Sequence, residues 1–267
     1  MMQPLTREFP LWYYSLDSVS ADPDWLATFA DQALIHGPQI SREWLAGRIR
    51  PRRIAYHYAA DGIVVVEIPT FLTKRFCGYS CYAGFPSLTD LAETIEELNR
   101  EQDVRAIILA FGDVPGSTTG GIEMVETAIK NARDDLFIVS HVHRRLLGAV
   151  VGLLFSTHAA YAGPKARVGA PRCAQLATGW LTRDGTGCVD TWNPIEEANN
   201  EKLTRDYNDI VCECIEKIRP NIDREALHNN EVMNAERAHD ANFIDGILTL
   251  DALVERIRCR LEFLEIK

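Results

Sequence analysis

Three apolar stretches decide the fold of this chain: Gly62-Ile-Val-Val-Val-Glu-Ile-Pro69, Val104-Arg-Ala-Ile-Ile-Leu-Ala-Phe111 and Leu136-Phe-Ile-Val-Ser-His-Val142. Each is short, rich in branched residues and bounded by turn residues, which is typical of strands buried on both faces. Between them, residues 87–99 and 121–132 carry apolar residues at helical spacing. This alternation predicts parallel βαβ units with right-handed crossovers, and therefore a layered α/β domain.

The flanking segments predict an N-terminal arm and a helical C-terminal region. Apolar residues at helical spacing indicate a short helix over residues 24–35. The Arg-rich, aromatic residues 41–58 are interpreted as a connector. We therefore expect residues 1–60 to form the arm and residues 61–267 to form the main domain. Beyond the third strand we expect an apolar helix over 147–160, a strand over 160–162, an irregular loop over 171–194, and helices over 194–219, 235–241 and 250–266.

Composition excludes several classes of function. A formal net charge of -10 and a pI near 5.2 disfavour a nucleic-acid partner, because phosphate-backbone affinity depends on a cationic surface. The N-terminal sequence has no cationic stretch followed by an apolar run, and the longest apolar stretch, Leu146–Phe155, is too short to span a bilayer. We therefore expect a cytoplasmic protein with no membrane span.

The cysteines predict neither a disulfide framework nor a metal site. They form an odd set scattered along a long chain, which favours reduced thiols. The C-x3-C and C-x-C pairs lack the usual zinc-knuckle gap, and no histidine lies close to them in sequence. We expect no metal and no cofactor; the seven residues are Cys77, Cys81, Cys173, Cys188, Cys212, Cys214 and Cys259.

Several short motifs follow one another in a recognisable order. They are Val114-Pro115-Gly116-Ser117 with Gly120 and Gly121 behind it, Thr157-His158-Ala159-Ala160-Tyr161-Ala162-Gly163-Pro164, and Val168-Gly169-Ala170-Pro171. Their order resembles the core of the S49 (signal peptide peptidase A) serine peptidases of the ClpP/crotonase superfamily. Those proteins carry Ser-Pro-Gly-Gly, then Ala-Asp-Arg-Ile-Tyr-Ala-x-Pro, then Gly-Ser-Ile-Gly. The resemblance implies a ClpP/crotonase-like layered fold of parallel ββα units.

The C-terminal part is closer to S49 than to ClpP. Asn193-Pro194 before a long helix resembles the Asn-Pro helix of that family, and Ala235–Asp245 resembles its Ala-Glu-Glu-Ala-x-x-x-Gly-Leu-Val-Asp stretch. An N-terminal arm before a Gly-Ile-Val-Val-Val strand is similar to the phage head-maturation branch. The resemblance implies a homo-oligomer, a ring or bowl assembled through the C-terminal helices and the strands near the site.

The catalytic serine and lysine of that family are missing here. Matched without gaps, the nucleophile position falls on Gly148, with Ala149 as the one-residue alternative, and the lysine position falls on Val189. The nearest hydroxyls, Ser140 and Ser156, lie eight residues to either side. A Ser-Lys peptidase needs both a hydroxyl and an amine that takes its proton, so ordinary peptidase activity is not expected.

A carbonyl-binding site is the part of such chemistry that the sequence retains. Backbone N–H groups at Gly116 and Ser117, at a strand end, and at Gly148 and Ala149, at an expected helix N-terminus, are of the type that polarises a carbonyl. Crotonases use two such groups on a thioester and have a glycine near the position of Gly148. Against a crotonase-like enzyme, the sequence shows no clear acid/base carboxylate here, and Asp113 is interpreted as a cap of its loop.

Other residues are weaker candidates for binding or catalysis. His141 and His143 occupy alternate positions on one strand. They are interpreted either as a general base or as histidines at a strand end whose ring nitrogens are already hydrogen-bonded. The run Ser117-Thr118-Thr119 is better explained as a turn and helix cap than as a nucleophile. Arg144 and Arg145 are interpreted as a carboxylate clamp, a subunit contact or a solvated pair. Cys173 is interpreted as a structural thiol. Gly169 and Ala170 are possible binding positions.

The leading hypothesis is therefore a catalytically inactive S49-like protein that serves as a structural, oligomer-forming or peptide-binding component, in the cytoplasm or in a phage or prophage assembly. Its partners would be copies of itself, peptide segments or an active paralogue. The alternative is an active enzyme of the superfamily, either a serine peptidase with a displaced nucleophile or a crotonase-like enzyme that uses the retained oxyanion hole.

Overall fold

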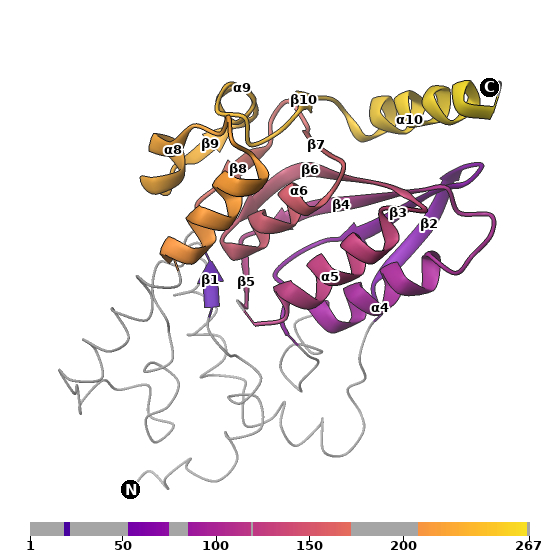
Figure 1. Cartoon of the computed structure of the whole chain (residues 1–267), viewed down its shortest axis with the longest axis horizontal. Helices are drawn as coiled ribbons and strands as arrows, with labels where there is room; N and C mark the ends of the chain where they lie inside the picture. The colour runs from indigo at the N-terminus through magenta and orange to yellow at the C-terminus, as the bar shows by residue number, and fades with distance from the viewer. Residues whose placement is uncertain (1–18, 22–52, 75–84, 119, 172–207, 266–267) are drawn as a thin grey trace, which may run out of the picture.

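The computed structural model describes residues 19–21, 53–74, 85–118, 120–171 and 208–265 (Figure 1). Within them, one large mixed sheet carries helices on both faces. The strand, helix, strand, helix, strand order expected for residues 62–142 is present, and the layered α/β fold class is confirmed.

Five neighbouring strands of the sheet run parallel, in the order β10-β7-β6-β4-β3. A sixth, β2, pairs antiparallel with β3 at the outer edge, while β8 pairs parallel with β6 and antiparallel with β9. Their bounds are β2 (Ala55–Ala60), β3 (Ile63–Ile68), β4 (Ala106–Val114), β6 (Phe137–Leu147), β7 (Ala159–Ala162), β8 (Arg167–Gly169), β9 (Val232–Asn234) and β10 (Gly246–Ile247).

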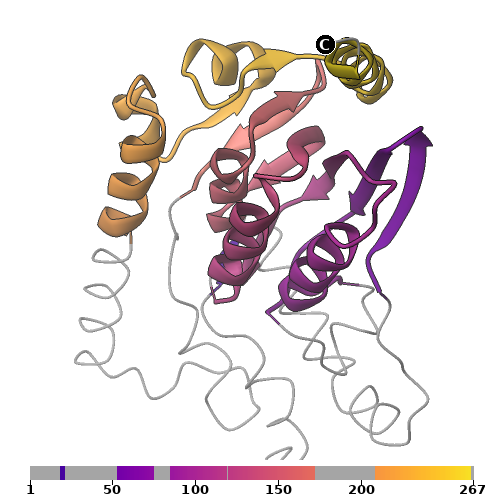
Figure 2. The same ribbon diagram turned by 45° about the vertical axis from the view of Figure 1, so that its right-hand side comes forward.

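Alternate residues of each central strand pack against different layers. On β3, Val64 and Val66 belong to the main core beneath α4 (Leu88–Leu98), α5 (Ile122–Ala132) and α6 (Gly152–Ser156). Ile63 and Val65 belong to a second core beneath α10 (Leu250–Glu265). Figure 2 shows the three helices side by side along the sheet, with α10 apart from them. Both faces are therefore buried, which explains the continuous apolar runs of these strands.

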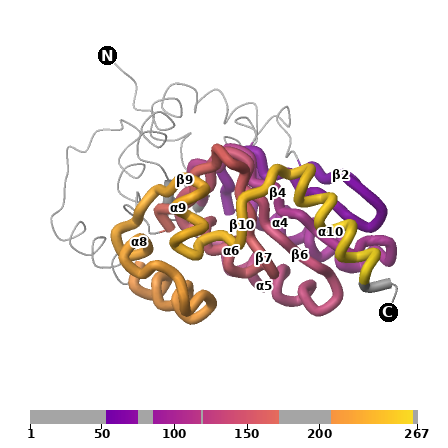
Figure 3. The backbone as a smooth tube through the Cα atoms, turned by 90° about the horizontal axis from the view of Figure 1, so that it is seen from above, coloured from indigo at the N-terminus to yellow at the C-terminus, as the bar shows by residue number. Residues whose placement is uncertain are grey.

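The C-terminal segment surrounds the end of the sheet that carries β7 and β8. It consists of a helix over residues 208–218, then α8 (Arg224–His228), β9, α9 (Ala235–Asp240), β10 and α10. Seen from above in Figure 3, this segment runs from α8 through α9 and β10, and α10 then crosses to the β2 side. Asp245 fixes it to β7, because its carboxylate accepts the Ala160 N–H at 2.7 Å and pairs with Arg219 at 2.7 Å.

Three expectations about this architecture were wrong. The third strand does not end at Val142, since β6 continues to Leu147, and the helix expected over 147–160 is only a 3-10 turn (Ala149–Val151) followed by the five-residue α6. Residues 55–60 are a paired strand and not part of a connector. The helix expected over 24–35 and most of the loop expected over 171–194 lie outside the described residues, as do residues 194–207 of the long helix.

Candidate functional site

The two backbone segments proposed to hold a carbonyl lie next to each other. After β4 and Pro115, the short strand β5 (Gly116–Thr118) pairs antiparallel with β1 (Val19–Ala21) and bridges to Leu72. β5 also contacts the 3-10 turn Ala149–Val151 that follows β6. The structure thus brings Gly116 and Ser117 together with the turn after Gly148 beyond the carboxyl ends of β4 and β6, where open α/β sheets bind ligands.

Gly148 has a backbone conformation that selects glycine. Its φ of 80° and ψ of -166° lie in a region that residues with a side chain rarely adopt. The Gly148 N–H donates to the Ala170 carbonyl at 3.0 Å, and the Gly148 carbonyl accepts from Val151 at 3.0 Å. The N–H of Gly148 is therefore engaged within the protein, and α6 is too short to add the helix dipole that we expected from the sequence.

Gly169 and Ala170 hold the other side of this turn. A side chain at Gly169 would collide with the carbonyl oxygen of Glu231, which accepts the Ala170 N–H at 2.9 Å. Ala170 itself has a φ of 48° and is one of the few described residues other than glycine with a left-handed backbone. The Glu231 carbonyl thus holds Ala170, whose own carbonyl holds Gly148, so these two residues are structural supports of the turn.

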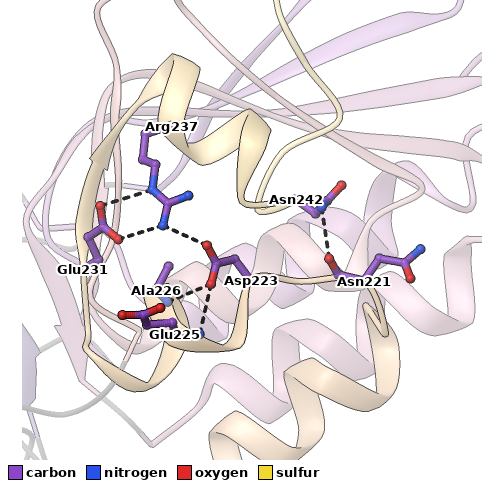
Figure 4. A network of polar contacts seen from close by, with 7 residues as sticks. All are labelled: Asn221, Asp223, Glu225, Ala226, Glu231, Arg237 and Asn242. Carbon is purple, nitrogen blue, oxygen red and sulfur yellow. Dashed lines mark hydrogen bonds and ion pairs between the residues drawn. The ribbon is translucent and has the colours of Figure 1, made fainter.

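An arginine fixes Glu231 in turn. Figure 4 shows Arg237 of α9 between two carboxylates: its Nη2 lies 2.8 Å from Asp223 Oδ2 and 3.3 Å from Glu231 Oε2. Asp223 also caps α8 by accepting the N–H groups of Glu225 and Ala226. The Ala226 N–H and the Arg237 guanidinium keep the pKa of Asp223 below its ordinary value. The C-terminal segment therefore supports the Gly148 turn through a continuous set of polar contacts.

The side chain of Ser117 is buried without a partner. Ser117 is fully buried, and its Oγ makes no hydrogen bond to any residue that the structure describes. A buried hydroxyl in this state costs about 1 to 3 kcal/mol and therefore calls for an explanation. Thr118 lies on the same strand, whereas Thr119 lies outside the described residues.

Of the two alternative hydroxyls, one lies on β6 and the other on α6. Ser140 lies in the middle of the sheet, paired with Leu109 and Ala160, and its Oγ accepts from Thr157 Oγ1 at 3.3 Å. Ser156 lies at the last turn of α6. Neither residue supplies a nucleophile at Gly148, as the sequence register predicted. Val189, the position of the missing lysine, is not among the described residues, and Cys173 is not either.

The two histidines and Arg144 do not join the site. His141 is buried on the α10 side of the sheet, where its Nε2 lies 3.0 Å from the Leu248 carbonyl oxygen, and burial lowers its pKa despite that bond. Its Nδ1 has no partner in the described part of the chain. His143 and Arg144 are exposed. These positions fit structural and solvated roles.

Asp113 is not the loop cap that the sequence suggested. It lies opposite Arg145 in the β4–β6 pairing, just after a register shift, and accepts from Arg145 Nε at 2.6 Å and Nη2 at 3.3 Å. The two side chains thus form a bidentate ion pair. Neither Asp113 as an acid/base group nor Arg145 as a ligand clamp fits this arrangement.

A carboxylate that the sequence did not single out lies beside the turn. Glu126 is on α5, and a methyl group at Gly152, the first residue of α6, would lie 3.5 Å from its Oε1. Burial, and then the nearby Glu123 carboxylate, raise the pKa of Glu126. Sequence spacing gives no signal for this contact, because it depends on how α5 packs against α6.

The described residues contain no group of three or more His, Cys, Asp or Glu that fits a metal ion. Among the cysteines in those segments, Cys212 is buried while Cys214 and Cys259 are exposed, and none of the three forms a disulfide there. In the same segments no helix is long and apolar enough to cross a membrane.

No protein-family model matches this chain, and no curated protein sequence matches it. Similar solved structures include an enoyl-CoA hydratase/isomerase family member, 15% identical, covering 82% of this chain and 78% of that chain with a TM-score of 0.49. The enoyl-CoA hydratase of Mycobacterium smegmatis is 16% identical, with coverages of 79% and 76% and a TM-score of 0.48. ThnE from S. clavuligerus is 14% identical, with coverages of 76% and 81% and a TM-score of 0.44.

Likeness at this level carries no argument about activity. The S49 branch, the phage role and homo-oligomerisation therefore remain predictions from the sequence.

Proposed function

We propose that this chain binds an acyl thioester of coenzyme A and holds its carbonyl oxygen at the junction of β5 and the Gly148–Ala149 turn. The proposal keeps the crotonase-like alternative of the sequence analysis and sets aside the inactive peptidase as the main hypothesis. Retained backbone donors, with no hydroxyl–amine pair beside them among the described residues, suit carbonyl binding better than acyl transfer to a serine.

The observation that carries the proposal is the unpartnered hydroxyl of Ser117. A ligand oxygen at the β5 junction would accept a hydrogen bond from Ser117 Oγ and remove the cost of burying it. Because Ser117 is fully buried, the ligand reaches it only if segments around β5 separate. We therefore expect association well below the diffusion limit.

A second donor is assigned to the turn. The Gly148 N–H is engaged by Ala170, so the proposal assigns the donor role to the N–H of Ala149, the first residue of the 3-10 turn. Ala149 already takes part in a polar interaction in this structure, and a carbonyl bound at its N–H would either add to that interaction or replace it. One hydroxyl and one backbone N–H would then polarise the thioester carbonyl from two sides.

The test is calorimetric titration with butyryl-CoA, with free coenzyme A as the reference ligand. We expect Ala149→Pro to weaken butyryl-CoA binding about tenfold, because it removes one donor worth about 1.4 kcal/mol. Proline suits the first position of a helical turn, so the backbone should be retained. The matched control is Ala149→Gly, which changes the same side chain but keeps the N–H.

Three outcomes would refute the proposal. They are failure of butyryl-CoA to bind, binding no tighter than free coenzyme A, and equal affinity of the proline and glycine variants. If Ala149→Pro does not fold, Ser117→Ala tests the other donor in the same titration. Covalent labelling by a fluorophosphonate would instead favour a serine nucleophile. If the protein reacts with no fluorophosphonate and binds no butyryl-CoA, the inactive S49-like scaffold becomes the better hypothesis.

A further inference from the structure

Three basic side chains meet at the end of the sheet opposite the Gly148 turn. They are Arg133, which follows α5, His158, which precedes β7, and Arg260 on α10. The Arg260 guanidinium carbon lies 4.2 Å from the centre of the Phe137 ring, and the centre of that ring lies 5.1 Å from the centre of the His158 imidazole. Phe137 is the first residue of β6, a strand of eleven residues that spans roughly 30 Å up to the turn. The cluster therefore lies far from the proposed carbonyl site.

Each of the three side chains is held in place by a neighbour. Arg133 Nη1 donates to the Ser156 carbonyl at 3.1 Å. The Nδ1 atom of His158 lies 3.1 Å from both the backbone nitrogen and the carbonyl oxygen of Ile138, which leaves Nε2 without a partner among the described residues. Arg260 is held by its stacking on the aromatic ring. Because these side chains are ordered before any ligand arrives, the entropic cost of binding one is lowered.

The cluster has no counter-ion in the described part of the chain. None of its three members forms an ion pair with a described residue. Most of the other described arginines lie within 4.0 Å of a carboxylate oxygen, as Arg145, Arg219 and Arg237 do. Asp134 and Asp135, the nearest carboxylates in the sequence, are exposed and make no ion pair there. In a chain with a net charge of -10, an uncompensated basic cluster indicates a site for an anion.

The electrostatics of His158 agree with a positive local field. Burial, and then the charges of Arg133 and Arg260, lower the pKa of the imidazole, although its contact with Ile138 acts in the opposite direction. An anion bound between the two guanidinium groups would offset their repulsion of the protonated ring. The field that opposes a third positive charge is the same field that attracts a negative ligand.

We propose that Arg133, His158 and Arg260 form a binding site for a phosphate group, either free phosphate or a phosphate ester. A planar guanidinium binds two phosphate oxygens at once, and both arginines keep N–H groups free for this. When His158 Nδ1 accepts the Ile138 N–H, the ring proton lies on Nε2, which supplies a further donor. The Phe137 ring already contacts Arg260 and His158, so recognition depends on the phosphate group and not on a stacked base.

The test is an NMR titration of the full-length protein, labelled with 15N at histidine, near neutral pH and at constant ionic strength. Inorganic phosphate, pyrophosphate and AMP are the probes, and chloride is the reference. The ring signals of His158 should shift with each phosphate compound and not with chloride. Arg260→Gln should weaken phosphate binding at least about tenfold, because it removes a charge-assisted pair of hydrogen bonds. The matched control is Arg256→Gln, one turn earlier on α10, where an exposed guanidinium lies 5.6 Å over the Tyr161 ring; its phosphate affinity should stay within about twofold of wild type.

The outcomes are distinct from those that test the proposed function. Equal shifts with phosphate and chloride would show only screening and would overturn the site, as would equal phosphate affinities of Arg260→Gln and Arg256→Gln. Binding of adenosine, which has no phosphate, would also contradict it. If Arg260→Gln does not fold, Arg133→Gln tests the second guanidinium in the same titration. Arg260→Gln should leave the affinity for butyryl-CoA unchanged, and a loss there would show that the cluster is not a separate site.

Discussion

Replacing Ser117 by alanine should stabilise this protein. In most buried positions Ser→Ala removes a hydrogen bond and lowers the free energy of unfolding by about 0.5 to 1.5 kcal/mol. At Ser117 there is no bond to lose within the described residues, and the buried hydroxyl has already lost its water. Removing it should raise the free energy of unfolding by about 1 kcal/mol and the melting temperature by about 3 °C.

Ser140→Ala is the matched control for that change. Ser140 is as fully buried as Ser117, but its Oγ accepts from Thr157 at 3.3 Å. The control should lower the free energy of unfolding by about 0.5 kcal/mol, since the Thr157 hydroxyl also has the Leu154 carbonyl at 2.9 Å as an acceptor. Urea unfolding of both variants, followed by circular dichroism, gives the two signs on one scale.

Ser117→Ala also separates the effect of the hydroxyl on stability from its effect on binding. Saturation at about one hundred times the dissociation constant raises the free energy of unfolding of a binding-competent protein by about 2.7 kcal/mol. Ser117→Ala should gain less from butyryl-CoA than the wild-type protein gains, although it begins more stable. The reasoning would be refuted if Ser117→Ala were destabilised as Ser140→Ala is, because the hydroxyl would then have a partner. An undiminished ligand-induced shift would exclude Ser117 from the site.

One further prediction concerns the supports of the site, and another concerns a buried histidine away from it. Arg237→Met should speed amide hydrogen exchange at Ala170 and Gly148, because the guanidinium holds Glu231. The amide of Ile107 in the central strand β4 should exchange as it does in the wild-type protein. If the variant changed the rates at all three amides by the same factor, or changed none of them, the connection would be disproved. Burial lowers the pKa of His141, so between about 6.5 and that lower value the unfolded chain binds more protons, and the free energy of unfolding should fall as pH drops through this window. His141→Gln, whose amide can still donate to the Leu248 carbonyl, should show a shallower fall in urea titrations at pH 5 and 7.5.

The sheet core was predictable because its strands are buried on both faces. Residues 62–142 alternate between apolar runs and amphipathic helices, and local pattern is enough to assign such elements. The end of β6 was not predictable in this way. His143, Arg144 and Arg145 interrupt the apolar run, yet β6 continues through them because it pairs with β7 in its first half and with β8 in its second. Pairing between distant strands leaves no local signal.

The edge strand β2 was missed because, unlike the core strands, it is largely exposed. Almost all of its residues are exposed, so no alternation of buried and exposed positions marks it as a strand. The turn that follows does carry a signal: Asp61-Gly62 joins β2 to β3, and Gly62 has a φ of 72°. A two-residue Asp-Gly connection before an apolar strand favours a hairpin. The turn sequence therefore favours a strand before Asp61, whereas the prediction of a connector over residues 41–58 used only their Arg-rich, aromatic composition.

The site was predictable in its backbone and not in its side chains. The order of motifs placed Gly116 and Ser117 opposite Gly148 and Ala149, and the structure does bring β5 against that turn. The positions of side chains around the turn depend on packing between segments: Asp113 forms an ion pair with Arg145, and Glu126 lies next to Gly152 because α5 packs against α6.

The conformation of Gly148 bears on how the missing nucleophile is explained. If a serine peptidase had merely lost its hydroxyl, the backbone at that position should still suit a residue with a side chain. With φ at 80° and ψ at -166°, Gly148 instead lies in a region that is essentially restricted to glycine, where another residue would cost about 1 to 3 kcal/mol. The Ala170 carbonyl holds its N–H in this conformation, and Glu231 holds Ala170. The architecture around the turn thus favours glycine at this position, and a serine placed there would be strained.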